Sequence, residues 1–90
     1  MSTVFLALQA NEETRQIIEA IQQDNPEARV NREPAMVKID AEGKLVVRRE
    51  TIAEIMGRDD FDLQELHINL ISLGGNVDED EDSLTISWNA

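Results

Sequence analysis

The sequence lacks most of the side chains that carry out chemistry. Its 90 residues include no cysteine and no tyrosine, one histidine (His67) and one tryptophan (Trp88). Without cysteine there is no thiolate nucleophile, no disulfide, and no thiolate ligand for zinc or an iron–sulfur cluster. One histidine cannot build a multi-histidine metal site, and no signature of nucleophilic catalysis stands beside it. These absences exclude most enzyme classes and favour a protein that acts on another protein.

Basic residues are also scarce. There are 8 of them against 19 carboxylates, which gives a net charge of −11. Nucleic acids and anionic membrane surfaces require clustered lysine and arginine, so neither is an expected partner. A basic or mixed-charge protein surface stays open as a partner. The equally weighted alternative is that the charge only maintains solubility.

Long apolar runs are missing too. None approaches the roughly 20 residues of a membrane span, and the N-terminus has no basic signal-peptide region, so we expect a cytoplasmic protein. The aromatic residues are Phe5, Phe61 and Trp88, while 41% of the chain is hydrophobic. We therefore expect one domain over residues 1–90 with an aliphatic core.

Periodicity predicts strands and helices in alternation. Residues 4–8 are apolar on both faces, which indicates a central strand. Asn11 is a good N-cap for the following helix, and Asn25-Pro26 ends it because the residue before proline avoids the helical conformation. A short strand over residues 28–32 comes next.

The middle of the chain has the pattern of a hairpin. Residues 36–39 and 44–47 are apolar segments on either side of residues 40–43. Gly43 suits the left-handed position after a type I turn. We therefore expect these two segments to pair.

Capping signals mark the second half. Thr51 and Glu54 have capping-box spacing, and Gly57 ends that helix. The remaining expected elements are a short capped turn at residues 62–65, a strand over residues 66–71 with Leu66 and Ile68 on one face, an acidic loop at residues 78–82 and a strand over residues 84–88. The predicted fold is α+β: a single small domain with a largely antiparallel sheet, two main helices and one short helical turn.

Three features could form a chemical site. His67 could be a general base, but no partner group accompanies it, so a structural or surface role is favoured. The acidic run at residues 78–82 could bind calcium, but it lacks EF-hand spacing. Gly74-Gly75 lacks the pattern of a phosphate loop and favours a strand bend, with close approach of a partner as the alternative.

Arg48, Arg49 and Arg58 form the main basic cluster. Arg58 could satisfy carbonyls at the end of the second helix, or could pair with Glu50 or Asp59. A docking role is the sharper interpretation, because arginine is enriched at binding hot spots.

Several segments together resemble one protein family. They are Asp24-Asn25-Pro26, Val37-x-Ile39, Glu42-Gly43-x-Leu45, Arg49-x-Thr51-Ile52-x-Glu54-x-x-Gly57-Arg58 and Phe61-Asp62-Leu63-Gln64-Glu65-Leu66-x-Ile68-Asn69-Leu70. Over nearly its whole length the chain is similar to the regulatory (effector, or coupling) proteins of bacterial multicomponent monooxygenases, and most of all to those of phenol hydroxylases. It lacks the long N-terminal extension of the methane-oxidising relatives.

The resemblance implies an α+β protein that is not an enzyme and holds no metal, flavin or haem. It implies docking on a hydroxylase with a diiron centre, which a reductase with FAD and an iron–sulfur cluster supplies with electrons from NADH. Docking would couple oxygen activation to the hydroxylation of phenol-type aromatics. Short polar side chains near the glycines and the arginine pair are the predicted partner-binding residues: Asn69, Ser72, Asn76, Arg48 and Arg49.

Two other functions stay open. A small cytoplasmic ligand-binding domain or enzyme would use His67 or paired carboxylates, and the isolated chain would then turn over or bind a small molecule. A generic acidic adaptor would have no redox link. An exposed sheet edge would also permit dimers of the free protein.

Overall fold

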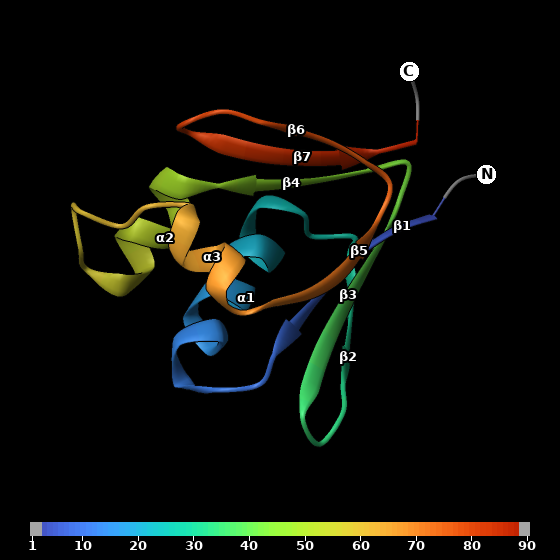
Figure 1. Cartoon of the computed structure of the whole chain (residues 1–90), viewed down its shortest axis with the longest axis horizontal. Coiled ribbons are helices and arrows are strands. Elements are labelled where there is room, and N and C mark those ends of the chain that lie inside the picture. Colours follow the sequence, from blue (N-terminus) through green and yellow to red (C-terminus); the bar gives the residue numbers. More distant parts are fainter. Residues whose placement is uncertain (1–2, 89–90) are drawn as a thin grey trace.

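The computed structural model describes residues 3–88, so residues 1, 2, 89 and 90 of the predicted domain lie outside the described part. All the strand pairings are antiparallel and strands outnumber helices, which confirms the α+β prediction. Figure 1 shows two small sheets with the helices in the angle between them. The elements are β1 (Thr3–Gln9), α1 (Glu12–Asp24), β2 (Arg29–Arg32), β3 (Met36–Glu42), β4 (Lys44–Arg48), α2 (Arg49–Met56), α3 (Gln64–Ile68), β5 (Leu70–Gly74), β6 (Asn76–Glu79) and β7 (Ser83–Ser87).

The first sheet has four strands in the order β2-β3-β1-β5. Val4, Leu6 and Leu8 of β1 are fully buried, and Ala7 on the opposite face is only 2% exposed. β1 lies between β3 and β5, so the prediction of a central strand is confirmed. The short strand expected near residues 28–32 is also confirmed as β2.

The predicted hairpin between residues 36–39 and 44–47 is wrong. β3 pairs with β1 on one side and with β2 on the other, so neither of its edges is left for β4. The chain turns at Gly43, whose φ of 81° is left-handed as expected, and β4 enters a second sheet of order β4-β7-β6. The turn conformation was therefore predictable, whereas competition among strands decided the pairing.

α1 begins and ends where the sequence predicts. The Asn11 side chain accepts a hydrogen bond from the Thr14 N–H (2.9 Å), and the Thr14 hydroxyl accepts one from the Asn11 N–H (3.0 Å). At the other end, the Asn25 amide bonds both the N–H and the carbonyl of Val46. Asn25 therefore ends α1 and also satisfies part of the free edge of β4.

The predicted capping box at Thr51 is wrong. α2 begins at Arg49, with Arg48 as its N-cap and no side chain of the described residues bonded as a cap there. The Arg49 N–H donates instead to the Asp82 carbonyl (2.9 Å), a contact between distant residues that a local pattern cannot reveal. Gly57 ends α2 in the left-handed conformation, as predicted.

The strand predicted over residues 66–71 is wrong in its first half. The short turn at residues 62–65 is present, but it continues as α3, and β5 starts only after that helix. Leu66 is buried while Ile68 is 74% exposed, so the two do not share a face. A five-residue helix and a strand have overlapping apolar patterns, which is why periodicity misassigned this segment.

The acidic run at residues 78–82 is only partly the expected loop. Its first two residues belong to β6, and the Asp80 carboxylate accepts hydrogen bonds from the N–H groups of Asp82 and Ser83 (2.8 and 2.9 Å). These backbone bonds favour the charged form and lower the pKa of Asp80. The rest of the run, residues 80–82, forms the turn of the β6–β7 hairpin.

One largely aliphatic core serves both sheets, as expected. Buried side chains from β1, α1, β3, β4, α2, α3 and β7 form it, together with the Phe61 ring. In residues 3–88, no helix has both the length and the apolar character that crossing a membrane requires.

Candidate functional site

Exposed apolar side chains single out one stretch of the surface. Among the described residues, the exposed large hydrophobic side chains are Ile68 (74%), Ile71 (48%), Val77 (44%) and Trp88 (50%). Three of these four lie in residues 68–77, which leave α3, form β5 and enter β6 (Figure 1); we call this stretch the edge segment. Exposed apolar side chains that gather on a small protein indicate a protein contact site.

Two predicted partner-binding residues lie on the edge segment. Ser72 and Asn76 both have exposed side chains. Ser72 is opposite Ala7 of β1, and Asn76 is opposite Ser87 of β7. The structure therefore places these polar groups on the same stretch of chain as the exposed apolar ones, along strands at the edges of both sheets.

Gly74 and Gly75 form the bend that carries the edge segment from one sheet to the other. A Cβ atom at Gly74 would overlap the Phe5 ring, and one at Gly75 would lie 2.5 Å from Ile86 Cγ2. Gly75 also has a φ of 141°, a backbone conformation that residues other than glycine rarely adopt. The expected strand bend is confirmed, and the close approach that these glycines permit is to side chains of the same chain, Phe5 and Ile86.

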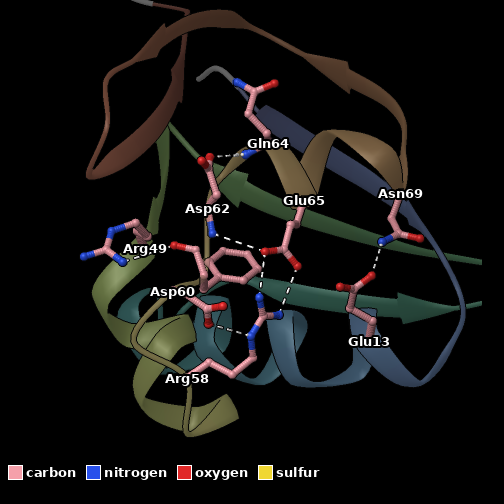
Figure 2. Close-up of polar contacts among 9 residues, drawn as sticks. Glu13, Arg49, Arg58, Asp60, Asp62, Gln64, Glu65 and Asn69 are labelled. Atoms are coloured by element: carbon pink, nitrogen blue, oxygen red, sulfur yellow. Dashed lines mark hydrogen bonds and ion pairs between the residues drawn. The ribbon is translucent and has the colours of Figure 1, made fainter.

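Asn69, a third predicted partner-binding residue, does not present its side chain to solvent. It is 5% exposed. Its Nδ2 donates to Glu13 Oε1 (2.9 Å), and its Oδ1 accepts from Asn11 Nδ2 (2.9 Å). Its backbone carbonyl accepts from the Gln9 N–H (2.9 Å). Asn69 therefore joins the start of the edge segment to the first turn of α1 (Figure 2).

Arg58 holds the other end of α3. Its Nη1 and Nη2 donate to the two carboxylate oxygens of Glu65 (3.0 and 2.9 Å), and its Nε donates to Asp60 (3.1 Å), as Figure 2 shows. The guanidinium lowers the pKa of the Glu65 and Asp60 carboxyls. Neither of the two local roles expected for Arg58 is found among these bonds: it pairs with Glu65 and Asp60 rather than with helix carbonyls, Glu50 or Asp59.

His67 lies on α3 and faces β6. Its Nε2 is 3.0 Å from both carboxylate oxygens of Glu79. This contact ties α3 to the edge strand of the second sheet. Within residues 3–88 no group of three or more His, Asp or Glu side chains is arranged to hold a metal ion.

Arg48 and Arg49 lie away from Asn76. Arg48 is opposite Ser83 on β7, whereas Asn76 is opposite Ser87, so the two positions are at opposite ends of the second sheet. The Arg48 side chain is exposed. Arg49 is half-buried, and its Nη1 donates to the Phe61 carbonyl (3.1 Å). The structure therefore separates the predicted partner-binding residues into two groups.

The exposed apolar residues of the edge segment were missed by sequence reasoning. Ile68 was expected on the same strand face as Leu66, and Ile71 and Val77 have no local feature that distinguishes them from core residues. Only the helical assignment of α3 and the edge positions of β5 and β6 place them at the surface.

Comparison with known proteins gives consistent matches. The model of the MmoB/DmpM family matches residues 2–87. The stimulatory component DmpM of phenol 2-monooxygenase from Pseudomonas sp. (strain CF600) is 48% identical over 87 residues, 97% of this chain and 96% of that relative. A chain of a phenol hydroxylase–regulatory protein complex is 48% identical with a TM-score of 0.92, over 98% of this chain and 100% of the other.

A more distant solved structure has the same fold. The regulatory protein B of soluble methane monooxygenase is 25% identical with a TM-score of 0.73, over 97% of this chain and 65% of that one. The family model and the 48% identical relative each span nearly all of the present sequence. This chain belongs to the MmoB/DmpM family.

Proposed function

We propose that this protein is the regulatory subunit of a phenol hydroxylase-type multicomponent monooxygenase and is not itself an enzyme. The observation that supports this most directly is the 48% identity, over 97% of the chain, to a stimulatory component of phenol 2-monooxygenase. A similar chain has been solved in a complex of phenol hydroxylase with its regulatory protein. The exposed apolar side chains of the edge segment supply a surface for such a contact.

The proposed protein acts by binding one conformation of its hydroxylase more tightly than another. A tenfold shift between two hydroxylase conformations needs about 1.4 kcal/mol of differential binding free energy. A few well-packed side chains supply that much. No reactive group is required in the regulatory chain.

The chemistry of the proposed system belongs to the partners. The hydroxylase would hold the diiron centre, and a reductase with FAD and an iron–sulfur cluster would bring electrons from NADH. The present chain would contribute no cofactor, and the complex would form in the cytoplasm. Its recognition surface, rather than a catalytic residue, would determine its effect.

The proposed contact surface is the edge segment. Ile68, Ile71 and Val77 would be covered by the hydroxylase, and Ser72 and Asn76 would supply polar contacts from the same stretch of chain. Burial of apolar side chains supplies most of the affinity in such an interface, and short polar groups set its alignment.

The remaining predicted residues have different proposed roles. Arg48 and Arg49 would form a second contact at the far end of the second sheet. Arg49 keeps its guanidinium at the Phe61 carbonyl, so Arg48 has the more available charge. Asn69, which is buried, would support the contact surface from within.

Reconstitution tests this proposal. Phenol hydroxylation and NADH consumption are measured with hydroxylase and reductase, with and without this chain. We expect hydroxylation per NADH to rise on addition of the chain, while the chain alone produces none. Binding without stimulation would indicate a generic adaptor, and turnover of a small molecule by the isolated chain would indicate the enzyme alternative; either result would contradict the proposal.

A further inference from the structure

The junction between α3 and β5 is held in place by side chains from other parts of the chain. α3 has five residues, well below the roughly 12–15 that an isolated helix needs to be even marginally stable in water. Its start is held by the Glu65–Arg58 ion pair, and its end is held at Asn69 (Figure 2). The exposed side chain of Ile68 lies between these two supports.

The backbone N–H, the backbone carbonyl and the side-chain amide of Asn69 all form hydrogen bonds. Its N–H donates to the Leu66 carbonyl (3.1 Å), which closes α3, and its carbonyl accepts from Gln9 on β1. The side-chain amide bonds Glu13 and Asn11 at the start of α1. These bonds orient the backbone where the helix ends and the edge segment begins.

The bonds to α1 require one donor and one acceptor on the same short side chain. Asn69 donates to the Glu13 carboxylate and accepts from the Asn11 amide. An aspartate of the same shape could accept from Asn11, but it would have no donor for Glu13. It would also place a second carboxylate where the Asn69 amide now contacts that of Glu13.

We infer that Asn69 is a positioning residue: its amide, bonded to Glu13 and Asn11, sets the orientation in which Ile68 and Ile71 are presented to the hydroxylase, and it does not itself contact that partner. The inference rests on the proposed function. It explains why a polar side chain is buried next to Ile68, the most exposed apolar residue at the start of the edge segment. It also gives the first turn of α1, which has no exposed apolar residue of its own, an indirect part in docking.

The experiment is a charge-matched rescue. Asn69→Asp removes the donor to Glu13, and Glu13→Gln then supplies a side-chain amide that can donate to the new carboxylate. The full chains compared are the parent, Asn69→Asp, Glu13→Gln and the double variant. Glu12→Gln in the Asn69→Asp background is the matched control, because Glu12 is on the same turn but pairs with Arg15.

Affinity for hydroxylase is taken from titrations of stimulated hydroxylation, and amide hydrogen exchange is measured at residues 68–72 in the free chains. We expect Asn69→Asp to weaken binding about tenfold or more and to speed exchange at those amides. The double variant should recover to within about threefold of the parent in both measurements. Glu12→Gln should restore neither.

Two results would overturn the inference. One is a double variant that binds as weakly as Asn69→Asp, which would indicate direct contact between Asn69 and the hydroxylase. The other is faster amide exchange in Asn69→Asp with unchanged binding, which would mean that affinity for hydroxylase does not depend on the orientation of this segment. If Asn69→Asp does not fold, Glu13→Ala replaces it, with an expected weakening of about threefold; unchanged binding would then overturn the inference.

Failure of the proposed function is distinguishable from failure of this inference. In that case the parent chain itself would not stimulate the hydroxylase. Loss and recovery of exchange protection in the free chains would still support Asn69 as the residue that orients the edge segment.

Discussion

α1 and α3 meet at the Asn69–Glu13 hydrogen bond, but they are stabilised in different ways. α1 has 13 residues, its own capping box, and a buried stripe that includes Ile17 and Ile21. α3 has five residues and depends on the side chains of Glu13 in α1 and of Arg58, which follows the C-cap of α2. The proposed contact surface therefore lies on the part of the molecule whose shape depends most on contacts between distant residues.

The largest expected effect is on the self-supporting part of the fold. Leu6→Ala removes a fully buried side chain from the central strand, so the free energy of unfolding should fall by about 3 kcal/mol. Urea denaturation followed by circular dichroism measures it. Gln22→Ala, on the exposed face of α1, is the control and should change stability by less than about 0.5 kcal/mol. Equal losses from the two variants would contradict the central position of β1.

The next largest effect should come from the bend in the edge segment. Gly75→Ala forces a side chain into a positive φ and against Ile86, so we expect a loss of about 2–3 kcal/mol in unfolding free energy. Gly57→Ala is the comparison, because Gly57 has a φ of 72°, in the left-handed helical region that other residues can adopt, and open space around it. Its loss should be about 1 kcal/mol. Similar losses at both glycines would mean that neither the contact with Ile86 nor the more extreme φ of Gly75 adds to the cost.

Removing an exposed side chain of the edge segment should affect docking and leave folding intact. For Ile68→Ala we expect about tenfold weaker affinity for hydroxylase, with stability within about 0.5 kcal/mol of the parent. Titration of stimulated hydroxylation and urea denaturation measure the two quantities. Gln22→Ala again serves as the control and should bind normally. Full affinity of Ile68→Ala would exclude Ile68 from the interface.

The smallest effect should be the pH dependence of the support for α3. Arg58 lowers the pKa of Glu65 in the folded protein. The ion pair therefore stabilises the fold fully at pH values above the ordinary glutamate pKa of about 4.3. This stabilisation is lost as the pH falls through the lowered pKa of the folded state. Arg58→Met should therefore unfold at lower urea than the parent at pH 6. The two midpoints should converge at acidic pH, once the Glu65 carboxyl is protonated in the folded parent as well. A constant difference at all pH values would indicate lost packing rather than lost charge pairing.

Local chemistry predicted the parts of the fold that are self-contained. The cap at Asn11, the stop at Asn25 and the left-handed turns at Gly43 and Gly57 can be recognised from neighbouring residues, and all four are confirmed. The hairpin between residues 36–39 and 44–47 failed because pairing is a competition. β1 and β2 occupy both edges of β3, and the sequence of the turn at residues 40–43 does not indicate which strands pair with β3.

The same distinction applies to the candidate site. Ser72 and Asn76 were selected as polar residues near the glycines, and they lie exposed on the edge segment. Asn69 was selected for the same reason but is buried, because Glu13 and Asn11 approach it from a helix far away in the sequence. Ile68 is exposed because it lies in the helix α3 rather than in a strand. The five residues of α3 are too few for helical periodicity to be recognised in the sequence.

The sequence by itself determined the α+β class, the aliphatic core, the ends of α1, the scarcity of reactive groups and the resemblance to monooxygenase regulatory proteins. All of these depend on composition or on residues within a few positions of one another. Only the tertiary structure decided that β3 and β4 belong to different sheets, that α3 is a helix, and that Ile68, Ile71 and Val77 share an exposed segment. Strand pairing and exposure depend on which distant residues come together, and that is a property of the whole fold.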